Sequence, residues 1–242
     1  MIDKKLIKER FKKSLVTYNQ NSFVQNKMAD NLIKMASPVK RFSAILELGC
    51  GSGLLTNKIK ETFGYDIYDA VDIVSECEEY IKAISQDINF IAEDIEKFST
   101  DKKYNLIISN ATFQWIEKFP NFLGKIYENL EENGMFIFST FGNNNFQEIK
   151  KITNESLNYY SCDELKNILQ EYKPFTLKEE ILSIDFETPI DILSHLKLTG
   201  VNSISSKHWT KKDLCEFSDK YKKFYPNIKL TYHPIYVAII KI

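Results

Sequence analysis

The sequence predicts an α/β protein built on an open, Rossmann-like sheet of mainly parallel strands. Apolar runs of strand length alternate with helical patterns between residues 44 and 140. Short links between such elements are typical of a parallel sheet covered by helices on both faces. The first apolar run ends in Glu47-Leu48-Gly49-Cys50-Gly51-Ser52-Gly53. Glycines at a strand-to-helix turn let the backbone bend sharply and approach a ligand closely, so this turn predicts a binding site.

The composition is ordinary for a water-soluble globular chain, with 43% hydrophobic and 27% charged residues in 242. We therefore expect a single domain over residues 1–242. No stretch has the roughly 18 apolar residues of a membrane helix, and the N-terminus lacks a signal-peptide core. The four cysteines are scattered, without metal-ligand spacing. We expect no metal site, no membrane association and a cytoplasmic location.

Charge is unevenly distributed along the chain although the formal net charge is only −1. Residues 1–13 hold six basic and two acidic side chains, and residues 189–227 hold seven lysines against four acids. Such local excesses usually mark a solvated face. Two basic segments on an acidic body also suit an acidic partner or substrate. A nucleic-acid partner is not expected, because a broad basic face is absent from the pattern.

The N-terminal segment, residues 1–37, is expected to be helical. Its apolar residues Leu6, Ile7, Phe11 and Leu15 recur at helical spacing, and a second helical stretch runs from Phe23 to Met35. Ser37-Pro38 ends it. Strands are then expected at 44–48, 67–72, 89–92, 104–109 and 135–140, with helices at about 54–62, 75–85 and 120–131.

The second half adds a helix at about 162–171, a strand at about 176–186 and a final strand at 235–240. Between those two strands lies a lysine-rich helical insertion, residues 189–227. The prediction thus contains seven strands. The N-terminal segment and the insertion are each expected to act as a lid over the carboxyl ends of the strands, where ligands bind in such sheets.

The glycine turn has an acid before three glycines at alternate positions, unlike the G-x-G-x-x-G fingerprint of dinucleotide sites. An acid there suits a ligand that carries an ammonium group. The alternative is a tight turn with no ligand. The pattern resembles the first motif of class I S-adenosylmethionine-dependent methyltransferases, and this resemblance implies a seven-stranded fold whose last strand is antiparallel. It makes S-adenosylmethionine the expected cofactor, held by Glu47, Gly49, Cys50, Gly51 and Gly53.

Three later positions extend the predicted cofactor site. Asp72 ends the second strand, where a carboxylate can accept both hydroxyls of a ribose, and Ile73 would lie against the adenine ring. The resemblance implies that Asp94 accepts from the adenine amino group beside the backbone of Ile95; the alternative is a helix-capping aspartate. The resemblance also implies that Asn110, which follows the fourth strand, faces the methyl donor.

The motif around Asn110 argues against one subclass of acceptor. Methyltransferases that modify amide or amine nitrogens in DNA or protein glutamine carry Asn-Pro-Pro-Tyr here, whereas this chain has Asn110-Ala111-Thr112-Phe113. Phe113 and Trp115 are either core residues or part of the site.

Several stretches resemble one methyltransferase family, the malonyl-[acyl-carrier-protein] O-methyltransferases of biotin biosynthesis. They are Phe11-x6-Tyr18-Asn19-x5-Gln25, Asn110-x2-Phe113-Gln114-Trp115, Phe138-Ser139-Thr140-Phe141-Gly142, His195-Leu196-Lys197-Leu198-Thr199-Gly200-Val201-Asn202 and Leu230-Thr231-Tyr232-His233. Two departures are an insertion of Asn227-Ile228-Lys229 after Tyr225-Pro226 and the lack of arginine in residues 189–227.

The resemblance implies methylation of the free carboxylate of a malonyl thioester on acyl carrier protein or on coenzyme A. Residues expected to orient the substrate are Tyr18, Gln25, Gln114 and Tyr232, and Lys197 and His233 are expected to offset its charge. His195 and His208 are expected at the surface. The alternatives are a methyltransferase for another small carboxylate or a tRNA-linked carboxylate, a module that binds S-adenosylmethionine without catalysis, and a nicotinamide dehydrogenase, which the glycine spacing disfavours.

Overall fold

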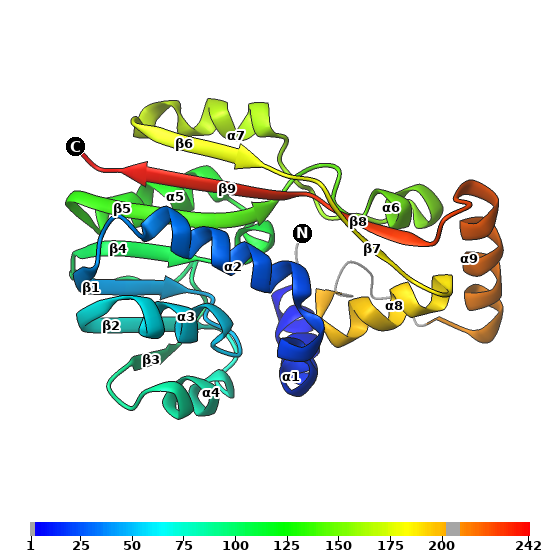
Figure 1. The fold of residues 1–242 in the computed structure, drawn as a ribbon, viewed down its shortest axis with the longest axis horizontal. Coiled ribbons are helices and arrows are strands. Elements are labelled where there is room, and N and C mark those ends of the chain that lie inside the picture. Colours follow the sequence, from blue (N-terminus) through cyan, green and yellow to red (C-terminus); the bar gives the residue numbers. More distant parts are fainter. Residues whose placement is uncertain (1–2, 202–208) are drawn as a thin grey trace.

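A seven-stranded sheet forms the centre of the computed structural model, which describes residues 3–201 and 209–242 (Figure 1). In chain order its strands are β1 (Arg41–Leu48), β2 (Gly64–Asp72), β3 (Asn89–Ala92), β4 (Tyr104–Ser109), β5 (Leu130–Phe141), β6 (Phe175–Glu179) and β9 (Pro234–Ile240). The spatial order is β3-β2-β1-β4-β5-β9-β6, and β9 is antiparallel to both neighbours. The predicted fold class is confirmed.

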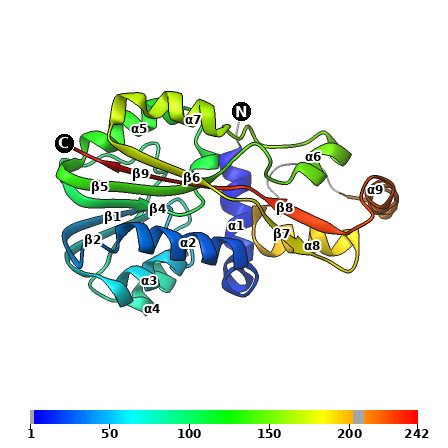
Figure 2. The ribbon, with the colours of Figure 1, turned by 45° about the horizontal axis from the view of Figure 1, so that its top comes forward.

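Helices cover both faces of this sheet (Figure 2). One face carries α2 (Phe23–Ala36), α3 (Leu54–Thr62) and α4 (Cys77–Ile84), and the other carries α5 (Phe119–Glu128) and α7 (Cys162–Leu169), which continues into η2 (Gln170–Tyr172). Neighbouring side chains of a strand point to opposite faces. Accordingly, Ile45 packs in the core cluster under α2 and α3, whereas Leu46 packs in the cluster under α5 and α7.

The prediction of one continuous strand at 176–186 is wrong, because this segment forms two strands that belong to different sheets. After β6 it forms β7 (Leu182–Asp185), which pairs with β8 (Lys229–Tyr232) in a separate two-stranded sheet. β9 begins at Pro234, and proline has no N–H for a ladder hydrogen bond. The large sheet therefore ends there, and both strands continue as the small sheet. The helix α6 (Gln147–Thr153) was not predicted.

Two of the predicted lid elements lie at the carboxyl ends of the strands (Figure 1). The N-terminal helix α1 (Lys4–Asn21) packs against α8 (Pro189–Leu198), and the Thr17 hydroxyl donates to the Leu198 carbonyl at 3.0 Å. The helix α9 (Lys211–Phe224) lies farther from the sheet, beyond β7 and β8. Asn202, Lys207 and His208 fall outside the described residues.

Residues with side chains suited to capping begin these helices. Asp3 accepts from the Leu6 backbone N–H at the start of α1, and Thr188 and Thr210 form capping boxes at the starts of α8 and α9. Such caps satisfy backbone donors that the first helical turn leaves free. Within the described part of the chain, no helix is long and apolar enough to cross a membrane.

Candidate active site

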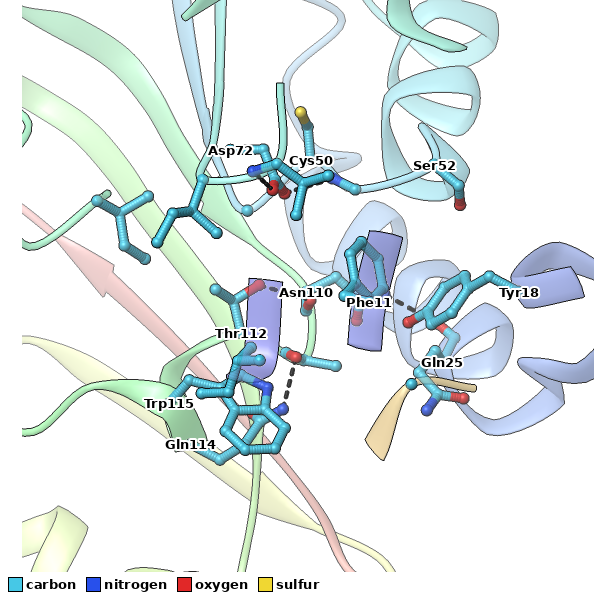
Figure 3. A pocket seen from close by; sticks show the side chains of 18 of the residues that line it. Phe11, Tyr18, Gln25, Cys50, Ser52, Asp72, Asn110, Thr112, Gln114 and Trp115 are labelled. Atoms are coloured by element: carbon cyan, nitrogen blue, oxygen red, sulfur yellow. Dashed lines mark hydrogen bonds between the residues drawn. The ribbon is translucent and has the colours of Figure 1, made fainter. Parts of the chain in front are cut away.

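A cavity lies where the strand order reverses between β1 and β4, at the carboxyl ends of the strands (Figure 3). It encloses about 1110 Å³ including its open mouth. Its floor is the glycine turn. Its roof comes from α1 and from the segment after α8, through Lys4, Ile7, Phe11, Tyr18 and residues 199–201. The cleft position expected from the sequence is the one observed.

The glycine turn reaches the cavity through its backbone. Gly49, Gly51 and Gly53 all have positive φ angles, of 75°, 52° and 78°, a region that favours glycine. Gly49, Cys50 and Gly51 line the cavity. Gly53 was also predicted to hold the cofactor, but it does not line the cavity. A Cβ there would collide with Ile84 of α4. Its role is close packing of α3 against α4.

Glu47 lines the cavity with its side chain only 1% exposed. Its Oε2 accepts hydrogen bonds from the Tyr68 hydroxyl at 2.5 Å and from the Thr56 hydroxyl at 2.7 Å. Burial raises the pKa of Glu47 to about 7, although these two hydrogen bonds act in the opposite direction. A carboxylate held in this way pairs well with a cationic ligand group, because the ligand's charge would compensate for lost hydration.

Asp72 is held by backbone donors at the end of β2. Its Oδ2 accepts from the Gly51 N–H at 2.8 Å and its Oδ1 accepts from the Val74 N–H at 2.9 Å. Burial raises the pKa of this carboxyl, opposed by the backbone hydrogen bonds. Each carboxylate oxygen has capacity for a second hydrogen bond, so Asp72 can still accept from a ligand. Ile73 lines the cavity beside it.

Asp94 lines the cavity and has a partner that the sequence did not reveal. The Lys4 ammonium donates to both carboxylate oxygens, at 2.7 and 2.8 Å, and also pairs with Glu96. Burial opposes the charge of Lys4, but the bonds to these two acids outweigh it and raise its pKa. The salt bridge ties the first turn of α1 to the sheet beside Ile95, another lining residue.

Three of the predicted substrate residues line the other half of the cavity (Figure 3). Tyr18 comes from α1, and its pKa is raised by burial and then by the charge of Asp72. Gln25 comes from α2 and is 2% exposed. Gln114 lies in the short helix η1 (Phe113–Trp115) and donates to the Ala111 carbonyl at 2.7 Å. Its Oε1 is buried and makes no hydrogen bond within the described residues.

Asn110 and Trp115 also line the cavity. The Asn110 amide donates to the Gln25 carbonyl at 3.0 Å and accepts from the Ser139 hydroxyl at 2.7 Å. Asn110 thus joins β4, β5 and α2 at the centre of the site. Of the two aromatic residues left open by the sequence, Trp115 belongs to the site, whereas Phe113 packs in the core among other phenylalanines.

The other three predicted substrate residues, Lys197, Tyr232 and His233, do not line the cavity. Lys197 is exposed on α8. Tyr232 is fully buried, and its hydroxyl lies 2.6 Å from Nε2 of His195, which the sequence placed at the surface. His233 is 2% exposed, with Nε2 2.6 Å from Glu179. Strand periodicity could not show that Tyr232 and His233 are both buried behind the lining residues rather than among them.

One cluster outside the cavity has the residue types of a metal site: Cys162, Glu179 and His233, with potential ligand atoms within 4.8 Å of one another. The Asn144 backbone N–H donates to Nδ1 of His233 at 3.2 Å. Nε2 therefore carries the ring proton and donates to Glu179, whereas a neutral imidazole that ligates through Nε2 needs its proton on Nδ1. The cluster is a hydrogen-bonded group rather than a metal centre.

Roof residues are the part of the site that the sequence missed. Lys4, Ile7, Phe11 and residues 199–201 line the cavity, although they lie far apart in the chain. Phe11 and Thr199-Gly200-Val201 stand within stretches that carry the family resemblance, which was the only available signal for them. Lys4 gave no signal, because its partner Asp94 is 90 positions away.

Comparison with known proteins agrees with this architecture. The family described as "Methyltransferase domain" matches residues 20–176. Malonyl-[acyl-carrier protein] O-methyltransferase of Calditerrivibrio nitroreducens is 35% identical over 97% of this chain and 96% of its own length. The solved YcgJ protein of Bacillus subtilis is 12% identical, covers 88% of this chain and 97% of that chain, and has a TM-score of 0.65.

A further solved structure is N-methyltransferase NodS of Bradyrhizobium japonicum WM9, in complex with S-adenosylhomocysteine. It is 13% identical, covers 89% of this chain and 86% of that chain, and has a TM-score of 0.53. The fold and the site together define a class I methyltransferase, an enzyme that takes its methyl group from S-adenosylmethionine. Within that class, the chain belongs to the malonyl-[acyl-carrier protein] O-methyltransferase family.

Proposed function

We propose that the protein methylates the free carboxylate of a malonyl thioester, carried by acyl carrier protein, in biotin biosynthesis. The name of its relatives supports this acceptor. The observation that carries the proposal is that two polar side chains, Tyr18 and Gln25, line the cavity across from the glycine turn, and that Gln25 is 2% exposed. Buried polar groups need hydrogen-bond partners, and a carboxylate offers several acceptor positions to them.

The residues of the glycine-turn half fit S-adenosylmethionine. Glu47 and the backbone of Gly49, Cys50 and Gly51 would hold its amino-acid portion, since the buried carboxylate suits an ammonium group and the glycines expose backbone. Asp72 retains acceptor capacity for ribose hydroxyls. The apolar side chains of Ile73 and Ile95, with Asp94, would receive the adenine, and Asn110 would lie near the reacting end. When bound, the cofactor supplies an electrophilic methyl group on a sulfonium centre.

The acceptor needs little chemical activation. A carboxyl group has a pKa of about 4 and is already an anionic nucleophile at neutral pH. No general base is required, so the protein's contribution is to align the acceptor and exclude water. Tyr18 and Gln25 can donate hydrogen bonds that orient it, and Gln114 can accept one from a nearby donor. The roof formed by α1 covers the reacting region.

The partner is proposed from charge. Lys5, Lys12 and Lys13 are exposed on α1, and α9 exposes further lysines at 211, 212, 220, 222 and 223. An acidic carrier protein suits these surfaces, whereas malonyl-coenzyme A is the alternative acceptor. A cytoplasmic location is part of the proposal, because all four cysteines are unpaired, as is usual in reducing compartments.

The test is a methyl-transfer assay with S-adenosylmethionine and malonyl-carrier protein, malonyl-coenzyme A or free malonate, with the product identified by mass. We expect a methyl ester on the malonyl thioester, weaker transfer to a succinyl thioester and none to an acetyl thioester. Sites built around a polar group reject analogues that lack it by about 10⁴-fold. Methyl transfer to a different small acid or to tRNA, with none to malonyl thioester, would show that the proposed acceptor is wrong. Cofactor binding without transfer to any of them would indicate a non-catalytic module.

One substitution tests whether Tyr18 contacts the acceptor rather than the cofactor. Tyr18→Phe should lower turnover about tenfold, the scale of one lost hydrogen bond, while S-adenosylmethionine affinity changes less than twofold. Equal losses in both quantities would show that Tyr18 serves the cofactor half instead.

A further inference from the structure

A buried hydrogen bond joins the insertion to the body of the protein. Nε2 of His195 on α8 lies 2.6 Å from the hydroxyl of Tyr232 on β8. Tyr232 is fully buried, and the rings of Phe186 and Tyr232 flank the imidazole at centroid distances of 5.4 and 6.2 Å. Burial lowers the pKa of His195 and raises that of Tyr232, so both groups are neutral.

His195 is connected directly to one wall of the cavity. Its backbone carbonyl accepts from the Thr199 N–H at 3.0 Å and from the Thr199 hydroxyl at 2.9 Å. Thr199 begins the lining segment that continues through Gly200 and Val201. Gly200 packs tightly on α1, because a Cβ there would come within 2.6 Å of the Ser14 hydroxyl. A shift of His195 would therefore move this wall.

Tyr232 is connected to a second wall. Its ring packs against Phe146 and Phe141, with centroid distances of 4.9 and 6.0 Å. Phe141 ends β5 and lines the cavity. The bond between His195 and Tyr232 thus links the wall after α8 to the wall at the end of β5, although neither residue lines the cavity.

We propose that His195 is a positioning residue that acts through Tyr232 to fix the distance between the Thr199–Val201 segment and Phe141, and so sets the shape of the acceptor half of the cavity. This inference rests on the proposed function for the identity of the acceptor. Neither His195 nor Tyr232 lines the cavity, and the Thr199–Val201 segment reaches the glycine turn through the intervening ring of Phe11. Acceptor binding should therefore respond to His195 more than cofactor binding.

The test compares His195→Gln, His195→Leu and Tyr232→Phe with the wild type, with Ser194→Ala, an exposed neighbour on α8, as the matched control. The glutamine amide can place either an acceptor or a donor near the position of Nε2, whereas leucine can place neither. We expect His195→Leu and Tyr232→Phe each to raise KM for malonyl-carrier protein about tenfold, with the dissociation constant of S-adenosylmethionine changed less than twofold. His195→Gln should restore KM most of the way to the wild-type value. The double variant His195→Leu/Tyr232→Phe should have a KM no higher than that of either single variant.

Amide hydrogen exchange provides a measurement that needs no acceptor. In His195→Leu, exchange of the peptide that contains Thr199 and Gly200 should accelerate about tenfold, while peptides from β1 and β4 stay as in the wild type. Unchanged exchange there, or equal changes in KM and cofactor affinity, would overturn the positioning role. If the wild type transfers no methyl group to malonyl thioester, the proposed acceptor fails, and the exchange result still decides whether His195 holds the wall.

Discussion

The ring of Phe11 lies directly against the backbone of Gly51. A Cβ on Gly51 would come within 3.0 Å of Cζ of Phe11, and the φ angle of Gly51 is +52°. The same ring approaches Gly200, where a Cβ would lie 3.2 Å from Cδ2. One aromatic side chain of α1 therefore spans two glycines, one in the floor of the cavity and one in the segment after α8. The roof and the floor touch at this point.

Gly51→Ala should weaken both this contact and the turn. Alanine at a positive φ costs about 1–2 kcal/mol, and the added methyl group would press on the Phe11 ring. We expect a loss of roughly that size in the free energy of unfolding and at least tenfold weaker S-adenosylmethionine binding by calorimetry. Gly124→Ala, a change within helix α5, is the control and should leave the cofactor affinity intact. Wild-type affinity in Gly51→Ala would contradict a cofactor role for this turn.

Asp72→Ala should weaken S-adenosylmethionine binding by roughly 1.5–3 kcal/mol, the scale of a lost charged hydrogen-bond acceptor. Calorimetry on the folded variant measures it. Asp66→Ala, an exposed position on the same strand, serves as the comparison. A folded Asp72→Ala protein with unchanged affinity would remove Asp72 from the ribose position.

Glu47 should make stability depend on pH in a direction opposite to that of most carboxyl groups. Its folded pKa, about 7, lies above its unfolded value of 4.5. Its stabilisation is therefore complete below pH 4.5 and is lost as pH rises toward 7. Relative to Glu47→Gln, the cofactor-free wild type should lose roughly 3 kcal/mol of unfolding free energy over that interval. Denaturant unfolding at several pH values measures the difference, and a constant difference would contradict the raised pKa.

Lys4→Ala should speed the exchange of the cofactor. The salt bridge of Lys4 with Asp94 and Glu96 ties the first turn of α1 over the cavity. Without it, we expect the dissociation rate of S-adenosylhomocysteine to rise a few-fold, about the effect of 1 kcal/mol for a partly buried ion pair. Stopped-flow displacement measures the rate. Lys5→Ala, the exposed neighbour, should behave as the wild type, and equal rates in all three proteins would mean that α1 does not control exchange.

Turnover with malonyl-carrier protein should fall steeply as salt rises, since exposed lysines at a protein interface are screened. Turnover with malonyl-coenzyme A should fall less, because that substrate makes fewer distant contacts. Steady-state kinetics between low and high ionic strength compare the two. Parallel curves would indicate that the lysines of α1 and α9 are a solvated face without a docking role.

The sequence predicted features that depend on local periodicity and turn chemistry. The strand that carries Glu47, the turn at Gly51 and the acid that ends β2 all stand where apolar runs and glycines indicated. The change of sheet between β6 and β7 escaped prediction, because a strand pattern does not reveal its pairing partner. The partners of Lys4 and Tyr232 also escaped, since each contact joins segments separated along the chain and depends on how α1 and α8 pack.

Two adjacent strands cross from the large sheet to the small one at the same level. β6 ends at Glu179 as β9 begins at Pro234, and the Glu180 N–H donates to the Pro234 carbonyl at 3.1 Å. From there β7 and β8 lead out to α8 and α9. Residues 182–232 are therefore a unit inserted through a two-stranded neck, whereas the glycine turn belongs to the other side of it. Of the described residues in that unit, Thr199, Gly200 and Val201 line the cavity. The side chains proposed to hold the methyl donor and the acceptor lie outside it, so the unit meets the site at the roof.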